Sequence, residues 1–323
     1  MTYENIQERV RPHLERMNMF IRETIYSPMP ILNNIVQGYL GKRGKQIRPL
    51  LTILSAELLG GVTDRVLHAG ASIEILHNAS LIHDDVIDNS KFRRGIPTVN
   101  AIWDNHIAVL TGDYLVSKSL DESILAGSME VVRMMSYLAD ILSEGELHQI
   151  FVAREHDFSM RKYVRTVEMK TAILFQSCVR MGAESNGVNL ERAKWLTRYA
   201  YYVGMCFQLR DDVFDYIGKG DFGKAAGHDL KEGKVTLPLL YAIRIATPEE
   251  RKEVEAVLDK DELNDEDVAW LSKFAVDHGG IEFCYRVMNR LKEKAVACLS
   301  HYPDCEARRD LEAIFTFIIS RSH

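Results

Sequence analysis

The same arrangement of aspartates occurs twice in this chain of 323 residues. The first copy is Asp84-Asp85-Val86-Ile87-Asp88 and the second is Asp211-Asp212-Val213-Phe214-Asp215. On a helix, the first and last aspartates of each copy lie one turn apart on the same face. Like charges at this spacing repel each other, so the pattern favours a bound cation. Carboxylate oxygens suit magnesium, which takes one or two carboxylates per ion and completes its shell with substrate phosphates.

A single acidic triplet is more often a solvated helix face or a helix end. Here both copies follow apolar runs, and this repetition favours a functional site over a solvated surface. His77 and His83 flank the first copy but lie about 120° apart on a helix, which is poor geometry for shared zinc ligation. The sequence therefore predicts two magnesium-binding clusters and no transition-metal site.

Short basic blocks beside glycines supply the positive charge that a diphosphate needs. Arginine offers paired donors and lysine a compact charge, and both suit phosphate oxygens. One basic run alone is usually a solvated surface, and Gly44-Lys45 is followed by Gln46, so it is no phosphate-binding loop of the Walker type. Several basic blocks lie beside the aspartate clusters in the sequence, and this placement favours a diphosphate site. The blocks are 42–49, 93–95, 170–171, 223–224 and 227–234.

Helices must position these residues. Only eight prolines occur, and stretches such as 131–151 place apolar residues three and four apart without sustained alternation. Breaks rich in glycine or proline separate such stretches. We predict an all-α fold in which roughly ten or more helices form a single domain over residues 1–323. The breaks lie at 60–61, 94–97, 182–187, 218–227, 247–248 and 279–280.

Composition limits the kinds of partner. The 40 Lys and Arg against 46 Asp and Glu give a net charge of -6, which offers no general attraction to nucleic acid or to an anionic membrane surface. The first residues lack a signal-peptide layout, and no run reaches the roughly 18 apolar residues of a spanning helix. We expect a cytoplasmic protein with no stable membrane insertion, whose five cysteines are reduced.

With these motifs the sequence resembles the trans-isoprenyl diphosphate synthases, and within them the polyprenyl group that makes longer chains. Beyond about residue 240 the similarity is limited to helical character and to the ending at 315–321. The matching blocks, in the order of that family, are 44–49, 84–88, 93–95, 112–115, 144–149, 170–171, 207–215, 223–224 and 229–238.

The resemblance implies a helical bundle around a central cavity, the isoprenoid synthase fold. It implies condensation of isopentenyl diphosphate with an allylic diphosphate in the trans configuration, to a product longer than C20. Magnesium would be the cofactor, with three ions when substrate is bound, and the chain would form a homodimer. The implied mechanism is ionisation of the allylic diphosphate followed by attack of the isopentenyl double bond, with the proton lost to the departed diphosphate.

The resemblance also implies residue roles. Asp84, Asp88 and Asp211 would ligate magnesium directly, and Asp85, Asp212 and Asp215 would assist or act through water. Isopentenyl diphosphate would be held by Lys45, Arg48, His77 and Arg94, with Phe207 facing its hydrocarbon part. The allylic diphosphate would be held by Arg93, Lys170, Lys224 and Lys234. The expected catalytic set is Lys170, Thr171, Gln208 and Lys234, of which Thr171 and Gln208 face the developing carbocation. Gln46 departs from the family, where many relatives have arginine.

Product length should depend on the helix that carries the first cluster. From Asp84 the growing chain would run back toward the N-terminal end of that helix, past Ser80 and Ala79. Small side chains leave this path open, so the floor would lie deeper, at Leu76, Ile75 or Ser72, with a facing helix from 112 to 135. Such a pair of small residues is otherwise a common feature of close helix packing.

Two rival functions remain open. A class I terpene cyclase would use similar metal chemistry on one diphosphate, and it would form cyclic hydrocarbon without isopentenyl diphosphate. A non-catalytic, prenyl-binding subunit of a heteromeric synthase could lose its metal ligands, and it would not turn over alone. The basic residues of a second substrate site argue against the cyclase, and six retained aspartates argue against the inactive subunit.

Overall fold

The computed structural model describes residues 2–41, 44–93, 95–155, 158–217, 227–260 and 262–320. Within these residues the chain is helical apart from its connections and one two-stranded hairpin, which confirms the predicted all-α fold of roughly ten or more helices. None of the described helices combines the length and apolar character needed to cross a bilayer.

The helices in chain order are α1 (Tyr3–Arg9), α2 (Arg11–Thr24), α3 (Pro30–Leu40), α4 (Ile47–Leu59), α5 (Asp64–Ile87), α6 (Val99–Ile102), α7 (Asn105–Leu125), α8 (Met129–Arg154), α9 (Met160–Val167), the π-helical turn η1 (Glu168–Ala172), α10 (Ile173–Ser185), α11 (Leu190–Ile217), α12 (His228–Lys231), α13 (Leu237–Ile245), α14 (Pro248–Leu258), α15 (Asp265–Asp277), α16 (Gly280–Leu299) and α17 (Glu306–Ser320).

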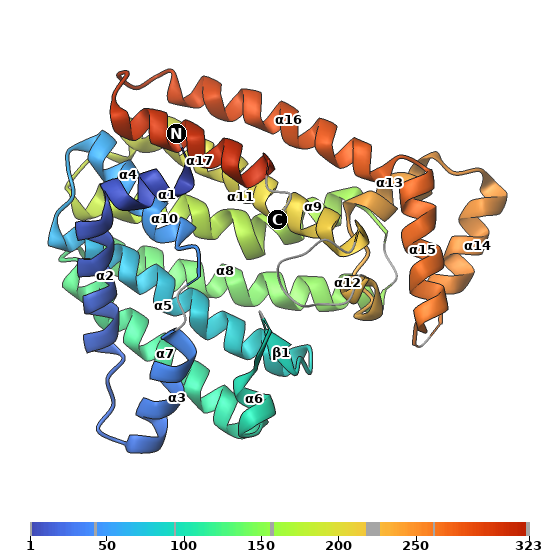
Figure 1. The fold of residues 1–323 in the computed structure, drawn as a ribbon, viewed down its shortest axis with the longest axis horizontal. Coiled ribbons are helices and arrows are strands. Elements are labelled where there is room, and N and C mark those ends of the chain that lie inside the picture. The colour runs from blue at the N-terminus through green and yellow to red at the C-terminus, as the bar shows by residue number, and fades with distance from the viewer. Residues whose placement is uncertain are drawn as a thin grey trace.

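Helix α5 carries the first aspartate cluster at its C-terminal end and packs along α7, α10 and α4 (Figure 1). The hydroxyl of Thr63 caps its first turn by accepting from the Val66 amide. Helix α7 approaches closely at Gly112, where a Cβ atom would overlap the ring of His83. Glycine at this position therefore allows α7 to pack against the end of α5 that carries the cluster.

Helix α11 carries the second cluster in its last two turns. Its buried positions include Leu196, Tyr199, Val203 and Cys206, whose spacing of three and four residues gives a continuous inward face. This face packs against α10 and α16, and η1 lies alongside. The approach to η1 is close, because a Cβ on Gly204 would lie 2.7 Å from the Ala172 Cα.

Residues 92–93 and 96–97 form the only strand pair of the described chain. β1 (Phe92–Arg93) pairs antiparallel with β2 (Ile96–Pro97), with Phe92 opposite Pro97 and Arg93 opposite Ile96. The sequence predicted a break here, and the break is a hairpin that directly follows the first cluster.

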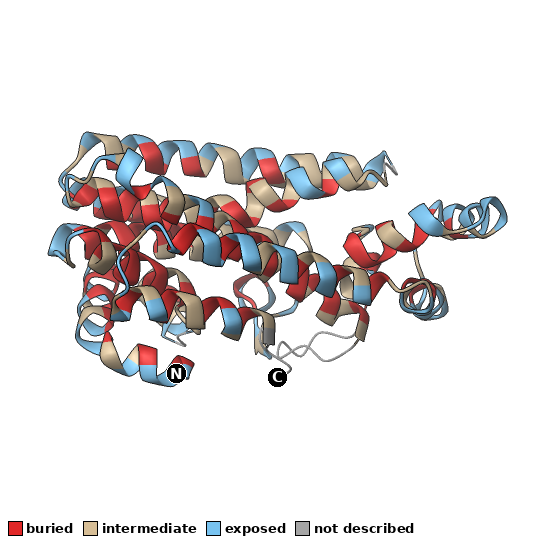
Figure 2. Ribbon diagram, turned by 90° about the horizontal axis from the view of Figure 1, so that it is seen from above, coloured by how far each residue is buried: buried red, intermediate tan, exposed pale blue. Residues whose placement is uncertain are grey.

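Buried residues lie on the inward faces of the packed helices, whereas exposed residues dominate the outer faces and the α14–α15 pair that projects at one end (Figure 2). The core extends along α4, α5, α10 and α11. The two aspartate clusters thus lie at the C-terminal ends of two long helices with many buried residues, α5 and α11.

Candidate active site

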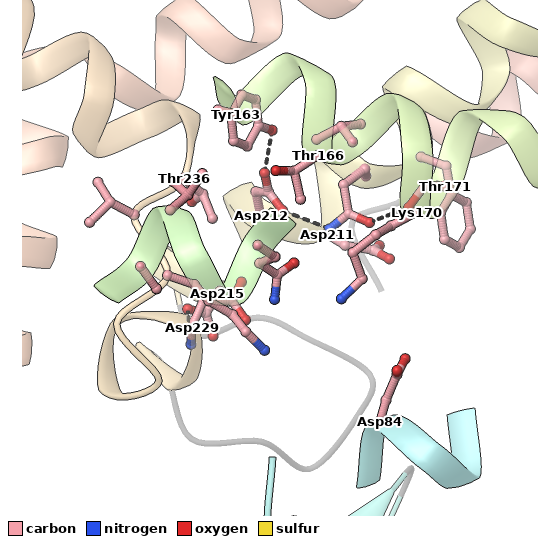
Figure 3. Close-up of a pocket in the computed structure, with 18 of the residues that line it drawn as sticks. Asp84, Tyr163, Thr166, Lys170, Thr171, Asp211, Asp212, Asp215, Asp229 and Thr236 are labelled. Atoms are coloured by element: carbon pink, nitrogen blue, oxygen red, sulfur yellow. Dashed lines mark hydrogen bonds between the residues drawn. The ribbon is translucent and has the colours of Figure 1, made fainter. Parts of the chain in front are cut away.

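A cavity of about 400 Å³ opens between the ends of α5 and α11, with α8, α9, η1 and the segment after α12 forming its other walls. Thirteen residues predicted from the sequence line it, although they come from distant parts of the chain. They are Arg48, His77, Ser80, Asp84, Arg93, Lys170, Thr171, Phe207, Gln208, Asp211, Asp212, Asp215 and Lys234. Figure 3 shows Asp84 on one side, with Lys170 and the aspartates of α11 across the cavity from it.

The other predicted residues lie outside the cavity wall or outside the described chain. Ala79 and Leu76 are buried in α5, next to the lining residue Ser80. Lys45 precedes α4, and its carbonyl accepts hydrogen bonds from the Tyr3 hydroxyl and, at 3.2 Å, from Gln7 Nε2. Asp85 and Asp88 lie next to the cavity, because their ion-pair partners, Arg93 and Lys234, line it. Arg94 and Lys224 lie outside the described residues.

The first cluster is held by cationic side chains from other elements. Asp85 is buried and accepts from Arg93 Nε of the hairpin at 2.8 Å. Asp88 pairs with Lys234 Nζ at 3.1 Å. Asp84 faces the cavity, where burial raises the pKa of its carboxyl to about 6 although the charge of Lys170 opposes this rise. The carboxylates are thus matched by charges that other segments bring to them.

The second cluster is held by hydrogen bonds from its own helix, from α9 and from the start of α12. Asp211 Oδ1 accepts from Arg210 Nη2 at 2.7 Å. Asp215 accepts from the backbone N–H groups of His228 and Asp229 at 3.0 and 3.1 Å, which fixes the start of α12 against α11. Burial and the nearby charge of Asp229 raise the pKa of Asp212 to about 8.

A chain of hydrogen bonds runs from η1 through α11 to α9. The Thr171 hydroxyl donates to Gln208 Oε1 at 2.8 Å, and Gln208 Nε2 donates to Asp212 Oδ1 at 2.8 Å. The Tyr163 hydroxyl donates to the other oxygen of Asp212 (Figure 3). The orientation of Thr171 in the cavity is therefore fixed through three further side chains.

The two predicted catalytic lysines also have fixed partners. Lys170 forms an ion pair with Glu146 of α8. Lys234 contacts Glu232 at 2.6 Å as well as Asp88. Burial disfavours the charge of Lys234, but Asp88 and Glu232 outweigh this effect and raise its pKa. Both lysines therefore present a localised positive charge at the cavity.

Sequence reasoning missed several of these contributors. Tyr163, Asp229 and Phe214 line the cavity, and Glu146 and Arg210 hold residues that do. Tyr163 lies seven residues before Lys170, two helical turns away, which is a signal that could have placed both on one face. The π-helical turn that carries Lys170 and Thr171 has no such signal, although turns of this kind are frequent at functional sites.

Carboxylate oxygens around a cavity with lysine and arginine fit magnesium together with a diphosphate better than a softer metal. In the part of the chain that the structure describes, no three His, Cys, Asp or Glu side chains converge closely enough to hold an ion by themselves.

Comparisons of the sequence and of the fold with known proteins all lead to polyprenyl diphosphate synthases. The chain matches the polyprenyl synthetase family over residues 29–274, which include every predicted site residue. It is 32% identical to octaprenyl diphosphate synthase of Escherichia coli over 99% of both chains. It is 34% identical to component 2 of heptaprenyl diphosphate synthase of Geobacillus stearothermophilus over 87% of both chains. Its fold is similar to that of polyprenyl synthase from Caulobacter crescentus, crystallised with calcium and isoprenyl diphosphate, with a TM-score of 0.93 and 30% identity over 100% of this chain and 98% of that one.

Proposed function

Because the chain belongs to the polyprenyl synthetase family, we propose that this cavity is where it joins isopentenyl diphosphate to an allylic diphosphate. The chain is a trans-prenyltransferase of the polyprenyl diphosphate synthase type, with a product longer than C20. The main support for the site is that Asp84 of α5 and Asp211 of α11 line one cavity with Lys170 and Lys234.

Magnesium would be held directly by Asp84, Asp88 and Asp211, and we propose three ions when substrate is bound. When bound, the metal supplies positive charge that stabilises the leaving diphosphate. Asp212 and Asp215 would assist indirectly, because their oxygens already accept hydrogen bonds from Tyr163, Gln208 and the start of α12. Asp85 would likewise assist through its pairing with Arg93.

The side chains of the protein would bind and orient both substrates. Arg93, Lys170, Lys224 and Lys234 would hold the allylic diphosphate and neutralise the charge it gains as the carbon–oxygen bond breaks. Lys45, Arg48, His77 and Arg94 would hold isopentenyl diphosphate with its double bond near the allylic carbon. Phe207, packed against Phe175 at a ring distance of 5.5 Å, would face the hydrocarbon part.

Bond formation would then follow ionisation. The electron pair of the broken bond stays on the diphosphate, and the isopentenyl double bond attacks the allylic cation to form the new carbon–carbon bond. The oxygens of Thr171 and Gln208 would face this cation, and their mutual hydrogen bond fixes them before the reaction begins. The released proton passes to the diphosphate, so no protein base is needed.

The growing chain would extend along α5 past Ser80, which lines the cavity. We propose that Ala79 and Leu76, buried directly beside it, set how far the product can extend. The small side chains of Ser80 and Ala79 would leave the path open for products longer than C20, and Leu76 would form part of a deeper floor.

We also propose that residues 1–323 form one domain, that two copies associate as a homodimer, and that the enzyme works in the cytoplasm. One observation favours the alternative of an inactive subunit: a relative is named component 2 of heptaprenyl diphosphate synthase. All six aspartates and both catalytic lysines are present here, which favours a catalytically competent chain.

Product analysis tests this function. The purified chain alone is incubated with isopentenyl diphosphate, farnesyl diphosphate and magnesium, and products are identified by mass spectrometry. We expect all-trans polyprenyl diphosphates longer than C20. An inactive chain that gains activity only with a second protein would support the subunit alternative, and cyclic hydrocarbon without isopentenyl diphosphate would support a terpene cyclase.

A further inference from the structure

Arg210 has an unusual environment for an arginine. It directly precedes the second cluster on α11 and is only 2% exposed. Its guanidinium carbon lies 5.1 Å from the ring centre of Phe207 and 5.4 Å from that of Phe214. Burying a guanidinium in an apolar environment is costly unless it is paired and hydrogen-bonded. The contacts of the Arg210 guanidinium therefore indicate what the buried charge does.

Two of those contacts link distant parts of the molecule. Nη2 donates to Asp211 Oδ1 at 2.7 Å, and Nη1 donates to the carbonyl oxygen of Ile318 at 3.0 Å. Ile318 lies in the last turns of α17, 108 residues further along the chain. The guanidinium thus joins a cavity carboxylate to the backbone of the C-terminal helix.

The end of α17 is itself held in place. Phe317, next to Ile318, stacks on Tyr3 of α1 with a ring distance of 4.2 Å and an interplanar angle of 11°. The Tyr3 hydroxyl in turn donates to the Lys45 carbonyl. The Ile318 carbonyl is therefore a fixed point against which Arg210 can be oriented.

We propose that Arg210 is a positioning residue that holds one oxygen of Asp211 and leaves the other available to the cavity, with α17 as its anchor. This inference rests on the proposed function, in which Asp211 is a magnesium ligand. Groups that hold a metal-binding carboxylate fix its direction and commonly change metal affinity about 10–100-fold when removed.

The sign of the effect separates this role from simple electrostatics. A positive charge beside a metal ligand repels a cation, so its removal alone would strengthen metal binding. A positioning role predicts the opposite, because Asp211 without its partner can adopt orientations that point away from the cavity. A purely structural role would lower stability and leave metal affinity unchanged.

The test uses Arg210→Met, which keeps an unbranched apolar stem between the two phenylalanine rings and removes both hydrogen bonds. Binding of Mn²⁺ is measured by equilibrium dialysis with the same concentration of inorganic diphosphate in both chambers, so that the excess Mn²⁺ on the protein side reports the bound ion. We expect about ten-fold weaker binding than in the parent chain. Arg210→Lys keeps the charge but not the fork, and we expect a smaller loss. The matched control is Arg198→Met, an exposed arginine on the same helix, which should bind as the parent does.

Unchanged or tighter Mn²⁺ binding by folded Arg210→Met would overturn the proposal, even if its melting temperature falls. If Arg210→Met does not fold, Arg210→Lys decides in the same way. Asp211→Ala separates this inference from the proposed function. Should Asp211→Ala bind Mn²⁺ as the parent does, the metal role of the cluster itself fails. Should it lose binding while Arg210→Met retains it, only the role of Arg210 fails.

Discussion

The two aspartate clusters have the same spacing but different surroundings. At the end of α5, Asp85 and Asp88 are paired with Arg93 and Lys234, long cationic side chains from separate segments. On α11, Asp212 and Asp215 are held by a tyrosine, a glutamine and backbone N–H groups. Two motifs with the same spacing of aspartates therefore need not have the same role. The side chains and backbone groups that hold each aspartate decide which carboxylate oxygens remain available to bind a metal ion.

This difference suggests that the two clusters have different roles in binding the metal and the diphosphate. In the first cluster, the cations that balance the aspartates are themselves proposed to bind diphosphate, so substrate and carboxylate share the same partners. In the second cluster, both oxygens of Asp212 and both oxygens of Asp215 accept hydrogen bonds from the protein, whereas Asp211 accepts through Oδ1 from Arg210. The predictions below test this contrast, beginning with the largest expected effect.

Replacing a directly ligating aspartate in either cluster should be most damaging. We expect Asp84→Ala and Asp211→Ala each to lower kcat by several orders of magnitude, because each removes a proposed metal ligand. Their stabilities should differ. Asp84→Ala relieves repulsion and should melt at the same or a higher temperature, whereas Asp211→Ala leaves Arg210 buried without its carboxylate and should melt lower. Steady-state kinetics and calorimetry check both points, and near-normal turnover by either variant would contradict the account.

The next effect concerns Lys234, which serves both Asp88 and the proposed diphosphate site. Lys234→Met should lower kcat about 100-fold, the usual cost of losing one donor that stabilises developing charge. Lys231→Met, three residues earlier and paired with Asp265 away from the cavity, is the control and should behave as the parent does. Equal rates for the two variants would remove Lys234 from the catalytic set.

A smaller effect is expected from the support of the second cluster. Tyr163→Phe removes the hydroxyl that donates to Asp212 and retains the buried ring, so kcat should fall about ten-fold. Tyr199→Phe is a matched control, because Tyr199 is also buried and its hydroxyl donates to the Leu311 carbonyl away from the cavity. It should lose stability without losing kcat. A similar kcat for both variants would show that Asp212 needs no such support.

The smallest effect on rate should come from the N-terminal side of the first cluster. We expect Ala79→Phe to shorten the dominant product from longer than C20 to about C20 or fewer, while ionisation of the primer continues. Overpacking at this buried site costs roughly 1–3 kcal/mol. If the variant does not fold, Ser80→Phe, on the cavity wall, takes its place. An unchanged product distribution in the active variant would show that the chain does not pass this residue.

The sequence predicted the helical fold well, because apolar spacing in α8 and α11 reports directly on helix packing. It also predicted most of the aspartates, lysines and arginines that line the cavity, since residue type and repeated spacing make them visible, but it gave no role to Asp229. It could not predict that Asp212 would be held by Tyr163, 49 residues away, because such a contact depends on how α9 packs against α11. The link from Arg210 to Ile318 was missed for the same reason.

The contrast between the clusters is tested most directly by a crystal structure of the chain with magnesium and inorganic diphosphate. The account predicts that Asp84, Asp88 and Asp211 contact the ions directly. It also predicts that Asp212 keeps its hydrogen bonds to Tyr163 and Gln208 and that Asp215 keeps those to the start of α12. Direct ligation by Asp212 or Asp215, with loss of those hydrogen bonds, would contradict it.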